Sequence, residues 1–230
     1  MIQAILFDIN GTLTNVDSIE FMRNYLGILA PRFVHFFSSE KFSKYYLRSM
    51  ETIKNHPKHG QTNMQTFYDD FSKATGQSYQ TLRPIFEAFY ESDFPALRCL
   101  VRAVPQGVKV VETAIQQGFL TAVASDPLMP LVAMQEQVRW SGLIPDHFKV
   151  IPALDNFHYC KPQLEFFREI AEGLGVKTEN CLLVSEHSED LICRELGMKT
   201  FLVGINKSET LTDYGGQLEE LLRLIKSGTL

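Results

Sequence analysis

Residues 4–14 read AILFDINGTLT, in which a short apolar run ends at Asp8 and continues into a turn containing Gly11 and Thr12. An unbroken apolar run of this length is typical of a strand buried on both faces of a parallel sheet. An acid at the carboxyl end of such a strand stands where open α/β sheets bind their ligands. Gly11 lets the backbone turn sharply, and the Thr12 hydroxyl with the loop amides can hold anionic oxygens. The same residues also suit an ordinary turn after a strand. Motifs elsewhere in the chain are needed to distinguish a ligand-binding loop from such a turn.

Similar apolar runs return in the second half of the chain, at 120–124, 181–184 and 200–203. Segments with helical periodicity lie among them, at 107–117, 128–140, 164–174 and 189–196. A glycine closely follows each of these segments, as at many helix ends: Gly118, Gly142, Gly175 and Gly197. Strands that alternate with helices predict an α/β fold with a Rossmann-like parallel sheet.

The stretch 16–96 differs, because it has no strand-like run and carries aromatic residues at helical spacing. They are Phe33, Phe36, Phe37, Tyr45, Tyr46, Phe67, Phe71, Phe86, Phe89 and Tyr90. Such stripes usually form the core of a helical unit, although some of these rings could line a substrate cleft. We therefore expect an α/β core domain formed by 1–15 and 97–230, interrupted by an all-helical cap domain at 16–96.

The overall composition excludes several classes of partner. The 230 residues carry a formal net charge of -5, which gives no electrostatic footprint for nucleic acid or for an anionic membrane. No apolar run approaches the roughly 18 residues of a membrane-spanning helix. The first residues lack the basic region of an export signal, and the four cysteines show no zinc-site or C-x-x-C spacing. We expect a cytoplasmic protein with neither a nucleic-acid nor a membrane partner.

The segment 8–14, DINGTLT, resembles the signature D-x-D-G-T-[LV]-T of the haloacid-dehalogenase-like hydrolase superfamily. Three further motifs of that superfamily have counterparts in the expected order: Ser125 after the second apolar run, Lys161 before a proline, and the pair Glu186 and Asp190 after the third run. The resemblance covers the whole chain. It includes the position of the helical cap between the first and second motifs, as in the phosphatase-like members.

Each of these residues also has an ordinary structural explanation when taken alone. A lysine before proline usually lies in a surface loop, and a serine at a strand end is usually a helix cap. Acids at 186–190 could simply favour the start of the following helix. The order and spacing of all four motifs together favour the site over these separate explanations.

The resemblance implies a role for each matching residue. Asp8 would be the nucleophile that forms an aspartyl-phosphate, Ser125 would hydrogen-bond the phosphoryl group, and Lys161 would pair with both. Mg²⁺ would relieve the negative charge, held by Asp8, the Asn10 carbonyl, Glu186 and Asp190, directly or through water. The substrate would be a small phosphorylated metabolite. The candidate substrate-binding residues are Gly11, Thr12 and Asp126.

The sequence departs from the superfamily pattern at two positions. Asn10 replaces the second acid, which in phosphatases protonates the leaving alcohol and then activates water. Asparagine cannot carry a proton in this way, and losing such help typically lowers rates by about a hundred- to ten-thousand-fold. In the fourth motif, Ser185-Glu186 replaces Gly-Asp and His187 follows. His187 is either a substitute base or a solvent-facing residue at a helix start.

Three interpretations of function follow from these residues. The favoured one is a Mg²⁺-dependent phosphatase or phosphotransferase acting on a small phosphorylated molecule. Asn10 favours a second, a catalytically weak or inactive relative that binds a phosphorylated ligand or a protein partner. The third is a 2-haloacid dehalogenase. It is less favoured because Asp126, rather than asparagine, follows Ser125, and because Glu186 and Asp190 indicate a metal.

Overall fold

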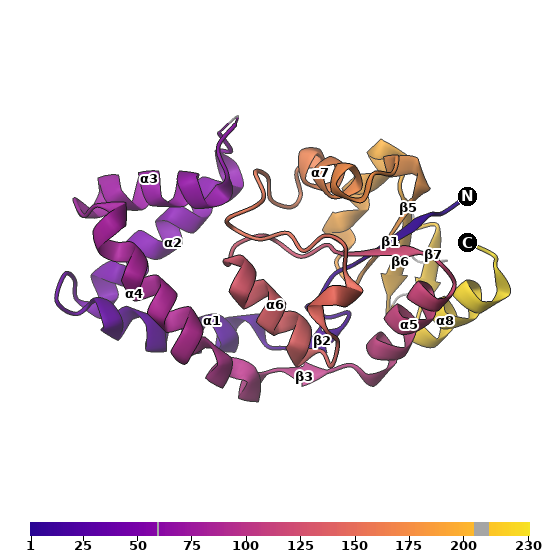
Figure 1. Ribbon diagram of the computed structural model, residues 1–230, viewed down its shortest axis with the longest axis horizontal. Helices are drawn as coiled ribbons and strands as arrows, with labels where there is room; N and C mark the ends of the chain where they lie inside the picture. The colour runs from indigo at the N-terminus through magenta and orange to yellow at the C-terminus, as the bar shows by residue number, and fades with distance from the viewer. Residues whose placement is uncertain (59, 205–211) are drawn as a thin grey trace.

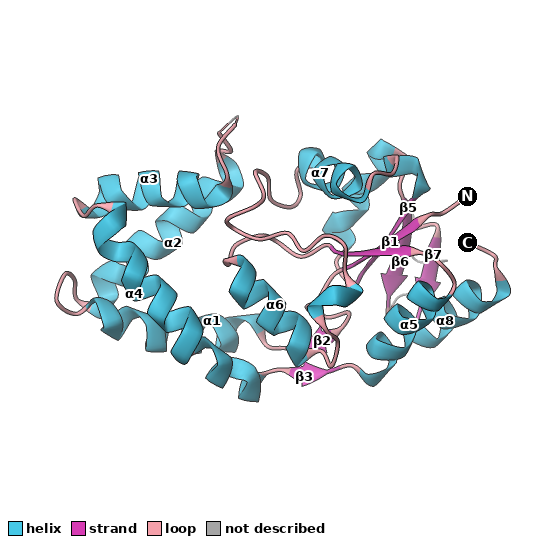
Figure 2. Cartoon of the chain, in the orientation of Figure 1, coloured by secondary structure: helices cyan, strands magenta, loops and turns pink. Residues whose placement is uncertain are grey.

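The computed structural model describes residues 1–58, 60–204 and 212–230. Its main element is a five-stranded parallel sheet in the order β4-β1-β5-β6-β7. Figure 2 shows its strands in magenta beside the helices. The strands are β1 (Ala4–Phe7), β4 (Leu120–Val123), β5 (Cys181–Ser185), β6 (Lys199–Val203) and β7 (Tyr214–Gly216). Strand β1 pairs with β4 on one side and β5 on the other, so Asp8 follows an interior strand, the second of the five.

Both faces of the sheet are covered. Along β1, Ile5 and Phe7 join one apolar cluster, and Ala4 and Leu6 join the other. Helices α5 (Pro105–Gln116) and α8 (Leu218–Ser227) pack on the first face, and α7 (Leu164–Leu174) packs on the second (Figure 1). All four residues of β1 are fully buried. This burial explains why the strand reads as a continuous apolar run rather than an alternating one.

The segment after β1 forms the helical cap. It contains α1 (Ser18–Leu29), η1 (Ala30–Phe33), α2 (Ser39–Asn55), α3 (Asn63–Thr75) and α4 (Tyr79–Ser92). Each α-helix begins after a residue whose side chain accepts a backbone hydrogen bond from its first turn: Asp17, Ser38, Thr62 and Ser78. Of the ten aromatic residues expected to form the cap core, all are buried except Phe36, which is exposed, and Tyr45, which is half-buried.

The chain leaves and re-enters the sheet region at one place. There β2 (Thr14–Asn15) pairs antiparallel with β3 (Arg102–Ala103). The 3₁₀ segment η2 (Phe94–Leu100) precedes β3 in the chain. Figure 1 shows this ribbon between the cap helices and the sheet. The cap is thus connected to the core through two adjacent strands. No sequence pattern predicts this ribbon, because each of its strands has only two residues.

Several element boundaries differ from those expected. Helix α6 (Leu131–Trp140) begins three residues later than predicted, because Pro130 disfavours helical geometry in the residue before it. The predicted helix at 189–196 is a 3₁₀ segment, η5 (Ser188–Leu196). Two short 3₁₀ turns, η3 (Pro145–His147) and η4 (Thr178–Asn180), were not predicted. Within the described ranges, no helix combines the length and apolarity needed to cross a membrane.

Candidate active site

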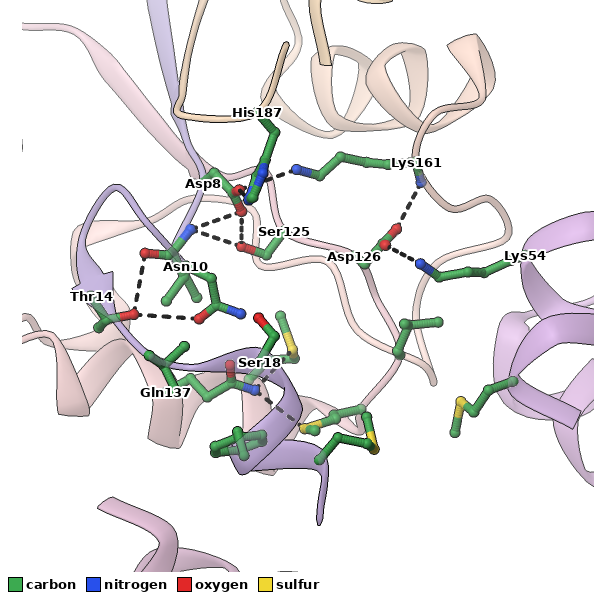
Figure 3. A pocket seen from close by; sticks show the side chains of 18 of the residues that line it. Asp8, Asn10, Thr14, Ser18, Lys54, Ser125, Asp126, Gln137, Lys161 and His187 are labelled. Atoms are coloured by element: carbon green, nitrogen blue, oxygen red, sulfur yellow. Dashed lines mark hydrogen bonds and ion pairs between the residues drawn. The ribbon is translucent and has the colours of Figure 1, made fainter. Parts of the chain in front are cut away.

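Four of the side chains selected from the sequence meet at the carboxyl edge of the sheet. Asp8 follows β1, Ser125 lies just beyond β4, and Asp190 lies in η5 after β5. Lys161 reaches the same place from the loop before α7 (Figure 3). Neighbouring parallel strands end at one edge, so residues far apart in the chain are brought together there.

The two oxygens of the Asp8 carboxylate have different surroundings. Oδ1 accepts hydrogen bonds from the Ile9 amide at 2.9 Å and from the Ser125 hydroxyl, which also accepts from the Ile9 amide at 2.8 Å. Oδ2 lies 3.4 Å from Lys161 Nζ and 3.6 Å from His187 Nε2. Ser125 therefore fixes the carboxylate through one oxygen and leaves the other facing two potential cations.

Asp8 is only 3% exposed, and burial raises the pKa of its carboxyl group, although Lys161 and the Ser125 hydrogen bond act in the opposite direction. Burial likewise disfavours the charged form of Lys161. The neighbouring carboxylates of Asp8 and Asp190 outweigh that effect and raise the pKa of the lysine. Lys161 is thus held as an ammonium ion beside the nucleophile candidate.

Lys161 links two buried acids. Its Nζ lies 2.7 Å from Asp190 Oδ2, and the same oxygen accepts a hydrogen bond of 2.7 Å from the Ser185 hydroxyl. Asp190 is 1% exposed. Ser185, which replaces the usual glycine of the fourth motif, therefore helps to orient Asp190 and, through it, Lys161.

Asp126 does not present a free carboxylate to a ligand. Its Oδ1 accepts from the backbone amide of Lys161 at 2.8 Å, and its Oδ2 pairs with Lys54 Nζ at 2.8 Å (Figure 3). Lys54 belongs to α2, so this ion pair connects the cap to the loop that carries Lys161. Sequence analysis missed Lys54, because a single lysine near the end of an amphipathic helix has the appearance of a solvated residue.

The backbone of Gly11 lies directly against the side chain of Glu186. Gly11 has a φ of 77°, and a Cβ built on it would come within 1.7 Å of Glu186 Cδ. The positive φ favours glycine at this turn, and any side chain there would have to displace the Glu186 carboxylate. The Glu186 side chain, 43% exposed, lies over the turn.

Asn10 and Thr12 occupy different parts of the same loop. Asn10 lines the cavity in front of Asp8, and its Oδ1 accepts from the Thr14 hydroxyl at 3.4 Å. Thr12 is fully buried, and its hydroxyl has no hydrogen-bond partner among the described residues. Of the three candidate substrate-binding residues, only Asp126 is among the described residues that line the cavity.

His187 lies closer to the site than a purely solvent-facing residue would. It lines the cavity, and its Nε2 is 3.6 Å from Asp8 Oδ2 and 3.9 Å from Glu186 Oε1. Its side chain is nevertheless 41% exposed. This placement makes a role as a substitute base geometrically accessible.

The cavity itself has a volume of about 620 Å³ and lies between the sheet edge and the cap. Its lining includes residues of α1, α2 and α6 as well as the loops that follow β1 and β4. The titratable residues gather at the end that contains Asp8, whereas the part next to α1 and α6 is mainly apolar.

The donor atoms can be tested against the magnesium ion that the resemblance implies. Among the described residues, no three acidic, histidine or cysteine side chains form a ready-made metal cluster. Asp8 and Asp190 do converge on Lys161, and no hydrogen bond from a described residue occupies the Asn10 carbonyl. Mg²⁺ retains several waters and requires few protein oxygens. The donor set therefore fits a hydrated Mg²⁺, with Glu186 nearby on the loop.

The charges of the lining also favour a cation. In the described part of the chain, the cavity is lined by four carboxylates but only two ammonium groups. They are Asp8, Asp126, Glu189 and Asp190, with Lys54 and Lys161. An anionic ligand would meet a net negative surface here unless a cation accompanied it.

Known proteins resemble the chain along nearly its whole length. No protein-family model matches it. Pyrophosphatase PpaX of Halalkalibacterium halodurans is 23% identical over 204 residues, 88% of this chain and 84% of that protein. Glyceraldehyde 3-phosphate phosphatase of Methanocaldococcus jannaschii is 26% identical over 235 residues, 99% and 98% of the two chains.

Solved structures share the fold. A HAD phosphatase from Thermococcus onnurineus superposes with a TM-score of 0.60 at 17% identity, covering 97% of this chain and 98% of that one. The L-2-haloacid dehalogenase of Xanthobacter autotrophicus gives 0.57 at 16% identity, covering 98% and 99%. A parallel sheet whose first strand leads into a buried aspartate beneath a helical cap defines a class of capped α/β hydrolases. The chain shares this fold with haloacid-dehalogenase-like phosphatases and dehalogenases, and its two curated relatives support membership of that superfamily.

Proposed function

We propose that this protein is a Mg²⁺-dependent phosphatase or phosphotransferase that acts on a small phosphorylated molecule through an aspartyl-phosphate at Asp8. One observation carries the proposal. Asp8 is held through Oδ1 by Ser125, and its Oδ2 faces the cavity beside Lys161. The curated relatives named above act on phosphorylated compounds, which supports phosphate chemistry at the same position.

The first step is attack on phosphorus. Asp8 Oδ2 forms the new bond to the phosphoryl group, and the bond to the leaving oxygen breaks with its electron pair going to that oxygen. The Lys161 ammonium, held by Asp190, reduces the repulsion between the carboxylate and the anionic phosphoryl group. Ser125 keeps the carboxylate oriented for attack.

Release requires a water molecule to attack the aspartyl-phosphate, give up a proton, and return Asp8 as a carboxylate. Asn10 cannot accept that proton. We therefore propose that phosphorylation of Asp8 is easier than its release. Substrates with leaving groups of low pKa, such as aryl and acyl phosphates, should react better than alkyl phosphates because they need little protonation.

Bound Mg²⁺ would supply charge neutralisation at the phosphoryl oxygens. Asp8, Asp190 and the Asn10 carbonyl are the proposed protein ligands, with Glu186 acting directly or through water. The net negative lining of the cavity supports this assignment, because a phosphate needs a compensating cation there.

The cysteines bear on where in the cell the protein acts. The four cysteines are free, and three of them are buried. Free thiols persist in a reducing compartment, so we propose that the protein acts in the cytoplasm, with no nucleic-acid or membrane partner.

The test is a panel of phosphorylated metabolites and para-nitrophenyl phosphate, assayed with and without Mg²⁺ and compared with Asp8→Asn. Hydrolysis that needs both Asp8 and Mg²⁺ supports the proposal. Asn10 is the observation that favours a second candidate, a binding protein of little or no activity. Tight binding of phosphorylated ligands without any turnover or Asp8 labelling would support that alternative.

A further inference from the structure

The part of the cavity away from Lys161 is built from apolar side chains. We call it the apolar chamber, and it is lined by Phe21, Met22, Leu47, Met50, Met134 and Trp140. In Figure 3, sulfur atoms of the lining lie near Ser18 and Gln137 and also below Lys54, away from Asp8. These residues come from α1, α2 and α6. Cap and core therefore build the chamber together.

The polar side chains on this side of the cavity are Ser18, Gln137 and the Asn10 amide, and apolar side chains outnumber them (Figure 3). The Gln137 amide nitrogen donates to Met129 Sδ at 3.3 Å, and a thioether is a weak acceptor. The Tyr46 hydroxyl is already bonded to the Tyr25 hydroxyl at 2.9 Å. A ligand with several hydroxyl groups would have to bury most of them without a partner, which is unfavourable.

The volume also suits a body larger than the phosphate group. A cavity of about 620 Å³ lies within the range that holds drug-sized ligands. Methionine side chains are flexible and polarizable, so Met22, Met50 and Met134 can adapt to an aromatic ring or a branched aliphatic group. Asp8, Lys161 and Asp190 lie at the other end, whereas the Lys54–Asp126 ion pair borders the chamber on the side of α2.

We propose that the substrate is an amphiphilic organic phosphate, whose phosphate faces Asp8 and whose aromatic or aliphatic body fills the apolar chamber. Polyhydroxylated phosphates such as sugar phosphates are selected against. The assignment of the phosphate end rests on the proposed function, whereas the assignment of the apolar body rests on the chamber alone.

The test uses phosphonates, which bind like phosphates but are not hydrolysed. Trp140 is the only tryptophan in the chain, lines the chamber, and is stacked on Phe94 at a centroid distance of 5.0 Å. Its fluorescence should therefore report binding. With Mg²⁺ present, phenylphosphonate should bind roughly ten- to fiftyfold more tightly than hydroxymethylphosphonate, because its ring is removed from water. Equal affinities would overturn the inference.

A matched pair of variants locates the effect. Met22→Gln places a polar group in the chamber, whereas Ile19→Gln makes the same change on the exposed face of the same helix, where Ile19 is 83% exposed. By titration calorimetry, Met22→Gln should lose at least about fivefold in affinity for phenylphosphonate while binding inorganic phosphate as before, and Ile19→Gln should match the wild type. A Met22→Gln protein that keeps full preference for phenylphosphonate contradicts the inference. If Met22→Gln does not fold, the wild-type phosphonate comparison decides.

The outcome is separable from that of the proposed function. Preferential binding of phenylphosphonate together with failure to hydrolyse phenyl phosphate would support the chamber assignment and contradict the enzyme assignment. Hydrolysis of phosphates with no preference for an apolar body would support the enzyme and overturn the chamber assignment.

Discussion

At the scale of single residues, the proposed mechanism assigns two chemical tasks to different side chains. Attack on phosphorus needs a held carboxylate and a nearby cation, and Asp8, Ser125 and Lys161 provide both. Release of phosphate needs a proton carrier, and Asn10 is not one. His187, whose Nε2 lies 3.6 Å from Asp8 Oδ2, is a side chain that could take its place.

Asn10→Asp should raise turnover of an aryl phosphate by roughly a hundredfold or more, about 2.7 kcal/mol of activation barrier. The reason is that the carboxylate restores a base for the attacking water. Steady-state kinetics of both proteins with Mg²⁺ measures the effect. If the wild type already turns over alkyl phosphates rapidly, His187 or another group is acting as the acid and base. If Asn10→Asp is as inert as the wild type, something besides a proton carrier is missing.

Lys161→Ala should destabilise the protein by about 3–5 kcal/mol at neutral pH, because it leaves buried carboxylates without their partner. It should also lower kcat/KM by about a hundred- to thousandfold. Without Lys161 the pKa of Asp8 rises further above its unfolded value. Protonation then relieves the unpaired charge, so the loss of stability should shrink as the pH falls.

Urea unfolding at two pH values measures this change. Lys199→Ala is the control, because Lys199 is 51% exposed and its ion pair with Asp213 should contribute less than about 1 kcal/mol. A Lys161→Ala protein as stable as Lys199→Ala at neutral pH would contradict the bridging role.

At the scale of elements, the cap and core are linked by an ion pair that crosses between them. Lys54 on α2 pairs with Asp126, which also accepts the Lys161 amide. Lys54→Met should raise KM severalfold and leave kcat unchanged, because it loosens the cavity lining without touching the nucleophile. Its effect on stability should stay below about 1 kcal/mol, since Lys54 is 41% exposed.

Lys58→Met is the matched control for this prediction. Lys58 pairs with Asp69 at 3.2 Å, also at the surface, but both partners belong to the cap. Michaelis–Menten kinetics and binding of inorganic phosphate compare the two variants. Equal KM values for Lys54→Met and Lys58→Met would show that the link between cap and core does not support the site.

The elements that could be predicted from the sequence are those whose own residues show an apolar run or a helical periodicity. Strands β1, β4, β5 and β6 were recognisable as apolar runs, and α7 as a helix with a terminal glycine. The β2–β3 ribbon carries no pattern, because its pairing depends on where two distant segments meet. Strand β7, with the sequence Tyr214-Gly215-Gly216, lacks the apolar residues that mark the other strands.

The same distinction applies to the site. Asp8, Ser125, Lys161 and Asp190 could be selected from motifs, and the structure brings them together. Lys54 could not be selected, because its role depends on how α2 lies over the sheet. The apolar chamber could not be predicted either, because its residues come from three helices whose packing the sequence alone does not specify.

At the scale of the whole molecule, we propose two domains, a core of 1–15 and 97–230 and a cap of 16–96. The chain crosses between them next to the β2–β3 ribbon. The cavity lies where the two meet, and more carboxylates than ammonium groups line it, so we expect a bound cation to stabilise the fold.

Mg²⁺ at a hundredfold excess over its Kd should stabilise the fold by about 2.7 kcal/mol. For a protein of this size, that corresponds to a rise in Tm of roughly 5–11 °C. Asp190→Asn should abolish the shift, whereas Asp146→Asn, at an exposed acid that does not line the cavity, should keep it. Thermal melts with Mg²⁺ and with a chelator provide the measurement. A shift that survives in Asp190→Asn would place the ion elsewhere.

The central claim is that Asp8 becomes phosphorylated and loses the phosphoryl group slowly because of Asn10. Its most direct test is to mix the protein with para-nitrophenyl phosphate and Mg²⁺, quench with acid, and measure the intact mass and the modified peptide. We predict a fraction of wild-type protein carrying one phosphoryl group on Asp8, a smaller fraction for Asn10→Asp, and none for Asp8→Asn. Product formation by the wild type with no phosphoryl group on Asp8 at any time, or with the label on another residue, would contradict the account.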